Sequence, residues 1–154
     1  TAMLGPIVGA AEGALRLIQE LAVAGDSRLD RNDTAVQLLV AESAAEVSTA
    51  ACLLERILER QDHYATQDLA APAPDRLALL QDRTFMTRLC TRAIERLINE
   101  LDAENLFADH PLQRQFRDLA AMAQQIGVNW DRNMSACGQK LLGLESNEAF
   151  LNVE

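Results

Sequence analysis

Residues 75–101 read DRLALLQDRTFMTRLCTRAIERLINEL, and the spacing of side chains in this stretch decides the fold class. Small and apolar residues recur three or four positions apart, and further apolar residues widen the same side. That side consists of Leu77, Leu80, Thr84, Thr87, Thr91, Ile94, Ile98 and Leu101, with Phe85, Leu89, Ala93 and Leu97 beside it. Such a pattern predicts one helix over residues 75–101 with a single buried face.

The same spacing recurs on both sides of this stretch and predicts three more helices. The first covers Leu4–Ala24 and stops at Gly25. The second follows three candidate N-cap residues, Asp30, Asn32 and Asp33, and ends near Asp62; residues 63–74 then form a loop. The fourth opens at residues 109–111 and runs unbroken to Gly143. Its expected core stripe is Phe116, Leu119, Ala123, Ile126, Trp130, Met134, Cys137 and Leu141.

No segment alternates polar and apolar residues over the length of a strand. The sequence therefore predicts an all-α protein, an up-down-up-down four-helix bundle, with residues 1–154 as a single domain. Helix one carries Gly5, Gly9 and Gly13, a small-residue ridge against which another backbone can approach closely. Close packing within the bundle is the first interpretation of this ridge, and packing against another domain or subunit is the second.

Composition removes several classes of function. The chain has 14 Lys and Arg against 23 Asp and Glu, a net charge of −9, so a nucleic acid would be repelled. The apolar N-terminal stretch is too short to span a bilayer, and we expect no membrane contact. The three cysteines form no CxxC pair, which is typical of reduced thiols in a cytoplasmic protein.

Ionisable residues supply no self-sufficient catalytic motif. No paired Glu-x-x-His motif or Cys/His cluster is present, and we expect no metal site. His63 and His110 fall at expected helix ends and are interpreted as capping or solvated residues. Arg88, Arg92 and Arg96 lie on one helix face. They are interpreted as a solvated stripe whose charge repulsion is relieved by neighbours such as Glu95, or as a docking site for a phosphate or an acidic segment.

The fourth expected helix contains the residues that resemble a known family. Residues 110–119 read HPLQRQFRDL, residues 128–131 read VNWD, and residues 138–144 read GQKLLGL. This run resembles the last helix of the acyl-CoA dehydrogenase superfamily, and in particular its branch of flavin-dependent monooxygenases. Residues 4–15, 35–37 and 41–51 are similar to the first two helices of the C-terminal domain of that branch. The likeness covers essentially all 154 residues.

The resemblance implies that this chain is the C-terminal domain of a larger cytoplasmic flavoprotein. The family holds FMN or FAD between domains and across the subunits of a homotetramer. Reduced flavin, supplied by a flavin reductase, then reacts with oxygen and a small-molecule substrate. The resemblance assigns Gln37 and Arg117 to cofactor binding and Asn129 and Trp130 to the substrate pocket.

The sequence departs from the family at its expected bases. A histidine is expected seven residues after Asp118, where this chain has Gln125, and the dehydrogenase glutamate position holds Ile126. We assign the catalytic position to Gln125, whose amide donates a hydrogen bond but takes up no proton near neutral pH. Residues 102–105 replace a glycine turn, and Cys137 replaces a tyrosine.

Three functions follow from these matches and departures. The first is a monooxygenase domain that acts on a substrate which is already nucleophilic. An acyl-CoA dehydrogenase or oxidase domain is the second, and a non-catalytic oligomerisation bundle is the third. As an isolated domain, the chain is expected to be inactive.

Overall fold

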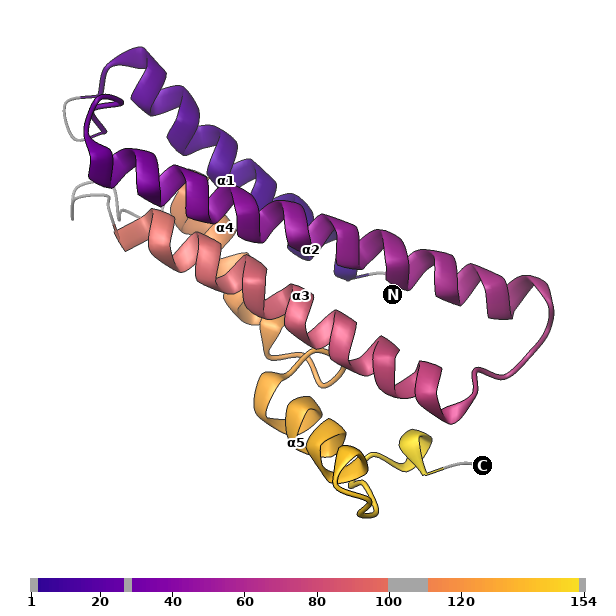
Figure 1. Ribbon diagram of the computed structural model, residues 1–154. Coiled ribbons are helices and arrows are strands. Elements are labelled where there is room, and N and C mark those ends of the chain that lie inside the picture. The colour runs from indigo at the N-terminus through magenta and orange to yellow at the C-terminus, as the bar shows by residue number, and fades with distance from the viewer. Residues whose placement is uncertain (1–2, 27–28, 100–110, 153–154) are drawn as a thin grey trace.

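The computed structural model describes residues 3–26, 29–99 and 111–152 (Figure 1). Within these ranges the chain forms helices and no strands, so the all-α class is confirmed. The elements are α1 (Leu4–Ala24), α2 (Thr34–Thr66), α3 (Ala73–Asn99), α4 (Pro111–Ala123), α5 (Trp130–Leu141) and the short 3-10 helix η2 (Ala149–Leu151).

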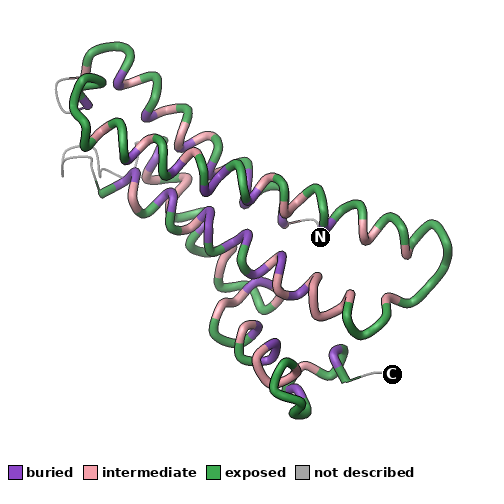
Figure 2. The backbone as a smooth tube through the Cα atoms, viewed as in Figure 1, coloured by how far each residue is buried: buried purple, intermediate pink, exposed green. Residues whose placement is uncertain are grey.

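Helix α3 is the centre of the domain. It packs against α1, α2, α4, α5 and η2, whereas α5 packs mainly on α3. Figure 1 shows α1, α2 and α3 as long rods, with α4 behind them and α5 set apart beyond α3. Buried residues lie on the sides of the helices that face one another (Figure 2). The main core joins residues of α1, α2, α3 and α4, and a smaller cluster joins Leu80, Ala136, Cys137 and Leu151.

The expected ends of the first helices are close to those found. Gly25 ends α1 in the left-handed conformation, with φ of 82°. Asp33 caps α2, because its side chain accepts a hydrogen bond from the Ala35 amide at 2.8 Å. Helix α2 continues to Thr66, past the expected end near Asp62, and α3 begins at Ala73. The connection is therefore shorter than the predicted loop of residues 63–74.

The single fourth helix was a wrong prediction. Helix α4 ends at Ala123 and α5 begins at Trp130, with a tight turn over residues 124–129. At the end of α4 the amides of Gln124 and Gln125 donate to the carbonyls three residues back, Ala121 at 3.3 Å and Met122 at 3.1 Å, so the last turn tightens. Asn129 then leaves the helical conformation, with ψ of 124°, as the N-cap of α5. The expected stripe is broken accordingly, since Ile126 is 63% exposed and Leu141 is 66% exposed.

The three glycines of the α1 ridge differ in whether another residue packs against them. A Cβ atom at Gly5 or Gly9 would meet nothing within 4 Å, so neither glycine is needed for packing among the described residues. At Gly13 a Cβ would lie 2.6 Å from the side-chain nitrogen of Gln115 on α4. Close packing within the bundle is thus confirmed at Gly13 only.

Two arginines of the α3 stripe tie α3 to α2. Arg96 binds Glu46 and Glu42, each at 2.8 Å, and Arg92 binds Glu46 at 2.9 Å. The Glu46 side chain is only 10% exposed, so both arginines neutralise a carboxylate that is largely removed from water. The predicted relief by Glu95 on the same helix was wrong, because the acidic partners of Arg92 and Arg96 come from α2.

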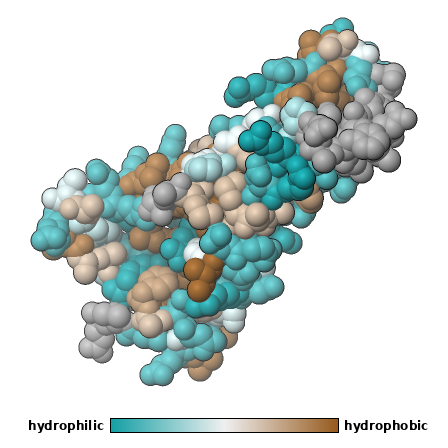
Figure 3. Space-filling view, turned by 180° about the vertical axis from the view of Figure 1, so that it is seen from behind, coloured by the Kyte–Doolittle hydropathy of each residue, from teal (hydrophilic) through white to brown (hydrophobic). Residues whose placement is uncertain are grey.

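Helix α2 is the one described helix with the length and composition of a membrane span, with a mean hydropathy of 1.3 over 18 residues. A core helix of a globular domain passes the same test. The buried face of α2 packs on α1 and α3, and Glu42 and Glu46 of α2 form the ion pairs above. Figure 3 shows the opposite side of the molecule from Figure 1, where hydrophobic patches are separated by hydrophilic residues.

Candidate functional site

The turn between α4 and α5 is the part of the structure on which the predicted site residues converge. The backbone of Gln125 is held on both sides, since its amide donates to the Met122 carbonyl at 3.1 Å and its carbonyl accepts two bonds. Asn129 then caps α5, where its side-chain oxygen accepts from the Arg132 amide at 3.1 Å. Gln125 and Asn129 therefore sit at fixed places in the turn.

Two hollows lie beside this turn, and Val128 lines both of them. We name them the threonine hollow and the arginine hollow after the α3 residues that line each one. The threonine hollow lies between α3 and the turn with the ends of α4 and α5, and the arginine hollow is also lined by Met3 and Leu4 at the start of α1 and by Gln61 of α2. The sequence placed Gln125, Asn129 and Trp130 in one cavity, whereas the structure divides them between two.

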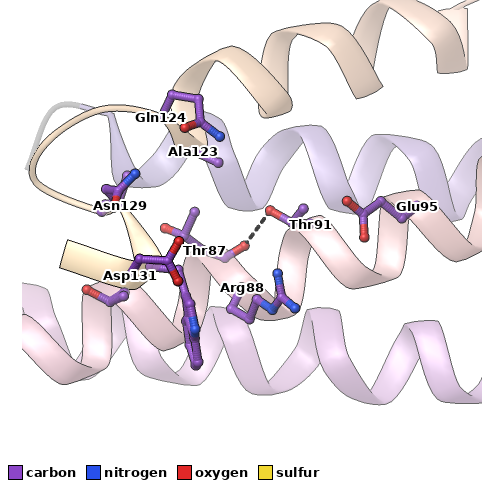
Figure 4. Close-up of a pocket in the computed structure, with 11 residues that line it drawn as sticks. Thr87, Arg88, Thr91, Glu95, Ala123, Gln124, Asn129 and Asp131 are labelled. Carbon is purple, nitrogen blue, oxygen red and sulfur yellow. Dashed lines mark hydrogen bonds between the residues drawn. The ribbon is translucent and has the colours of Figure 1, made fainter. Parts of the chain in front are cut away.

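The threonine hollow has a volume of about 400 Å³ and is mainly polar (Figure 4). Its α3 wall is Thr84, Thr87, Arg88, Thr91 and Glu95, and its other wall is Ala123, Gln124, Val128, Asn129, Trp130 and Asp131. In Figure 4 the labelled α3 residues lie along one helix and face the end of α4 and the start of α5.

Hydrogen bonds within α3 and to α5 fix the hydroxyl groups of this hollow. Thr84 is 1% exposed and accepts a bond from the Asn133 side chain at 3.2 Å. The Thr91 hydroxyl donates to the Thr87 carbonyl at 2.9 Å, the bond drawn in Figure 4. The Arg88 guanidinium lies 5.4 Å from the centre of the Trp130 ring, within range of a cation–π contact. Trp130 is half-buried and forms a wall of the hollow, so its placement on a core stripe was wrong.

The arginine hollow has a volume of about 260 Å³ and combines apolar and polar walls. Its lining residues are Met3, Leu4, Gln61, Arg83, Gln125, Gly127 and Val128. The side-chain amide of Gln125 has no hydrogen-bond partner among the described residues, and this side chain is exposed at the hollow. The hollow is thus lined by an amide donor from the turn and by a guanidinium from α3.

Arg83 is the charged group of this hollow. Burial lowers the pKa of its guanidinium, although Glu148 and Cys137 act in the opposite direction. Its Nε atom is buried and has no hydrogen-bond partner among the described residues. The guanidinium lies 5.6 Å from the centre of the Phe150 ring of η2.

The two residues assigned to cofactor binding lie away from the turn. Gln37 lies on the first turns of α2, where its side chain donates to the Arg31 carbonyl at 3.0 Å. It lines a mainly apolar hollow of about 330 Å³ between the end of α1 and the start of α2. Arg117 lies on the exposed face of α4. Neither residue is brought near Gln125 by this chain alone.

The remaining predicted residues add no ionisable group to the turn. His63 is exposed in the last turn of α2 and contacts Gln67, in keeping with a solvated role. His110 and residues 102–105 lie outside the described residues. No three His, Cys, Asp or Glu side chains come together as metal ligands within the ranges that the structure describes.

Sequence reasoning missed the α3 contribution to both hollows. Thr84, Thr87 and Thr91 were placed in the core stripe, and Arg83 was not singled out. The signal was present, because three hydroxyl residues interrupt an otherwise apolar face at spacings of three and four. A polar interruption of this kind indicates a lined cavity when a second element leaves that face uncovered.

The family model for the acyl-CoA dehydrogenase C-terminal domain matches residues 2–130, which include α1 to α4 and the turn. The chain belongs to the acyl-CoA dehydrogenase C-terminal domain family. The match ends at Trp130, so α5 and η2 lie beyond the part that the family model covers.

Curated relatives of this acyl-CoA dehydrogenase C-terminal domain are oxygenase components. The chain is 32% identical over 151 residues to the FADH2-dependent resorcinol hydroxylase oxygenase component of Rhizobium sp. strain MTP-10005, covering 90% of this chain and 37% of the relative. It is 29% identical over 121 residues to the p-hydroxyphenylacetate 3-hydroxylase oxygenase component of Acinetobacter baumannii, covering 77% and 28%. The aligned part of the chain therefore spans 37% of the first relative and 28% of the second.

Solved structures agree on the fold. The 3-HSA hydroxylase of Rhodococcus sp. RHA1 matches with a TM-score of 0.76 at 23% identity, covering 94% of this chain and 37% of that one. The HsaA monooxygenase of M. tuberculosis matches with a TM-score of 0.77 at 22% identity and the same coverage. XiaF from Streptomyces sp., solved with FADH2 and glycerol, matches with a TM-score of 0.72 at 22% identity, covering 92% and 37%.

Proposed function

We propose that this chain is the C-terminal domain of the oxygenase component of a flavin-dependent monooxygenase. The observation that carries the proposal is the 32% identity, over 90% of the chain, to an oxygenase component that uses FADH2. The second curated relative is also an oxygenase component, and both are named as hydroxylases of small aromatic compounds. We therefore propose a small aromatic substrate and reduced FAD, rather than FMN, as the flavin.

The arginine hollow offers hydrogen-bond donors to a small substrate or to one edge of a flavin ring. The Gln125 amide and the Arg83 guanidinium are donors, and a flavin or phenol presents oxygen atoms that accept hydrogen bonds. Leu4 and Val128 supply apolar contact and are both buried, so they reduce the access of water from their sides. Bound reduced flavin would supply the two electrons by which one atom of O2 becomes water while the other enters the substrate.

Because the residue at position 125 is a glutamine, the substrate must lose its proton without help from this side chain. An amide orients an oxygen atom by donating a hydrogen bond, but it does not remove a proton near neutral pH. Gln125 can therefore position the reacting groups, whereas the proton of a phenol must leave by another route. Binding of the ionised phenol is one such route, and a base from another domain is a second.

The full protein would contain further domains, a flavin shared between them, and several subunits. The open surfaces at Gly5 and Gly9, which no described residue covers, support packing of α1 against another domain or subunit. The apolar hollow beside Gln37 lies at the far end of the bundle from the turn and supports a second contact there. We propose a homotetramer that is soluble and cytoplasmic and receives its reduced flavin from a separate reductase.

An acyl-CoA dehydrogenase domain is the weaker alternative. That chemistry needs a carboxylate base, and the expected position holds Ile126, whose side chain is 63% exposed. A non-catalytic bundle remains the third reading, and it predicts that the full-length protein binds no flavin. The two alternatives therefore differ from the leading proposal in measurable ways.

Isotope labelling of the product tests the proposed function. The full-length protein would be mixed with FADH2 from a separate reductase, with resorcinol or 4-hydroxyphenylacetate as substrate, under oxygen-18 gas. We expect a hydroxylated product that carries one labelled oxygen atom and whose formation depends on FADH2. A protein that binds FADH2 but reduces or oxidises only acyl-CoA thioesters would contradict the proposal, and so would one that binds no flavin.

A further inference from the structure

Arg83 is a half-buried cation for which the described residues provide no direct ion pair. Its Nε atom is removed from water and makes no hydrogen bond among the described residues. The residue as a whole is only partly covered and lines the hollow, so its guanidinium can meet a ligand there. A guanidinium that has no carboxylate partner favours a ligand with an anionic oxygen.

The acidic residue near Arg83 is already engaged elsewhere. Glu148 lies close enough to act on the guanidinium, but its carboxylate is hydrogen-bonded to the Arg132 side chain. Cys137, on α5, is the other ionisable group that acts on Arg83, and burial raises the pKa of its thiol, so it is neutral near pH 7. The Phe150 ring covers one side of the guanidinium. The positive field of Arg83 is thus left available to the arginine hollow.

The size and walls of the hollow restrict the ligand. Pockets for drug-sized molecules have volumes of about 300–1,000 Å³. At about 260 Å³, with Met3, Leu4 and Val128 as apolar walls, the arginine hollow suits a molecule with one aromatic ring. Gln125, which lines the same hollow, offers a second donor to the ligand.

We propose that Arg83 binds the phenolate oxygen of a single-ring aromatic substrate and thereby selects the ionised form of a phenol. This inference rests on the proposed function, and it explains how the site works without a base at position 125, because the phenol loses its proton to water and Arg83 binds the phenolate. A cation beside a hydroxyl group favours the ionised form, because the charge that develops on oxygen is stabilised by Coulomb attraction. Arg83 would then deliver an already nucleophilic ring without a proton acceptor at position 125.

Binding of 4-nitrophenol to the flavin-free full-length protein tests this inference, because the phenolate absorbs visible light and the phenol does not. We expect the pKa of the bound phenol to fall by about one unit, a tenfold change in its ionisation constant. Arg83→Gln should abolish this shift and weaken binding about tenfold. The matched control Arg114→Gln removes the same charge from an exposed site on α4 and should change neither quantity.

Glu148→Gln provides a second variant that keeps Arg83 and its packing. Loss of this carboxylate should strengthen the positive field and lower the pKa of bound 4-nitrophenol further. 4-Nitroanisole, which has no ionisable hydroxyl group, should bind equally well to the wild type and to Arg83→Gln. An unshifted phenol pKa in the wild type would overturn the inference. Should Arg83→Gln fail to fold by circular dichroism, an unchanged shift in Glu148→Gln would overturn it.

The inference and the proposed function can fail separately. The spectroscopic test needs neither flavin nor oxygen, whereas the isotope test needs both. Labelled product with no phenol pKa shift would contradict only the proposed role of Arg83. A phenol pKa shift that depends on Arg83, without any labelled product, would contradict the oxygenase function and still support the phenol-binding site.

Discussion

Leu97→Ala is expected to lower the free energy of unfolding by about 2–5 kcal/mol. Leu97 has no exposed surface and belongs to the main core, which joins α1, α2, α3 and α4. Alanine removes apolar surface that is buried on folding and leaves a cavity at the centre of the bundle. Domains of this size are stable by only about 5–15 kcal/mol, so the loss is a large fraction of the total. Chemical unfolding followed by circular dichroism would measure it.

Leu38→Ala is the matched control for this substitution. It removes the same atoms from a leucine on α2 that is 65% exposed, and we expect a change within about 0.5 kcal/mol. Equal effects at the two positions would contradict the assignment of α3 as the central helix. The contrast therefore tests the fold without reference to function.

Gln125→His is expected to introduce a pH dependence into hydroxylation that the wild type lacks at this position. The Gln125 amide does not titrate, whereas a histidine there would lose its proton near pH 6.5, its unperturbed pKa. Below that pH the imidazolium is no base, so turnover by the variant should rise as the pH increases through this value. General base catalysis contributes about 10²–10⁴-fold, and we expect at least the lower part of that range at pH 8.

Gln125→Leu tests the amide itself. Loss of one hydrogen bond to the reacting groups should lower turnover about tenfold, since 1.36 kcal/mol corresponds to a factor of ten in rate. Gln67→Leu, at the exposed end of α2, is the control and should leave turnover unchanged. Should Gln124→Leu lower turnover while Gln125→Leu does not, the reaction takes place at the threonine hollow and the assignment of Gln125 is wrong.

The helices were predictable because their signals are local. The spacing along residues 75–101 placed α3 within two residues at either end, and the Asp33 cap and Gly25 stop marked boundaries that the structure confirms. The family was predictable from the short run of residues around Arg117 and Asp118. Each of these features depends on residues that are near neighbours in the sequence.

The break between α4 and α5 was not predictable in the same way. Apolar residues at Ile126 and Trp130 keep helical spacing across it, so the periodicity alone continues the helix. What ends α4 is a backbone arrangement, in which the amides of Gln124 and Gln125 bond three residues back, together with the Asn129 cap. An Asn two residues after Gly127 is a recognisable start signal for a helix, and it was the available clue.

The partners of the site side chains depend on tertiary packing and were missed for that reason. Nothing in the local sequence brings Arg83 and Gln125 to the same hollow, because they are 42 positions apart, Arg83 on α3 and Gln125 in the turn after α4. The pairing of Arg96 with Glu46 is similarly distant. Gln37 and Arg117 remain predictions, since any flavin contact they make would involve parts of the protein outside this chain.

A crystal structure of the full-length protein with bound FADH2 tests the central claim most directly. We expect the flavin ring beside the turn of residues 124–129, with the Gln125 amide in hydrogen-bonding distance of the ring or its substrate and with Arg83 lining the same hollow. A flavin ring bound elsewhere, with the arginine hollow filled by protein side chains, would contradict it.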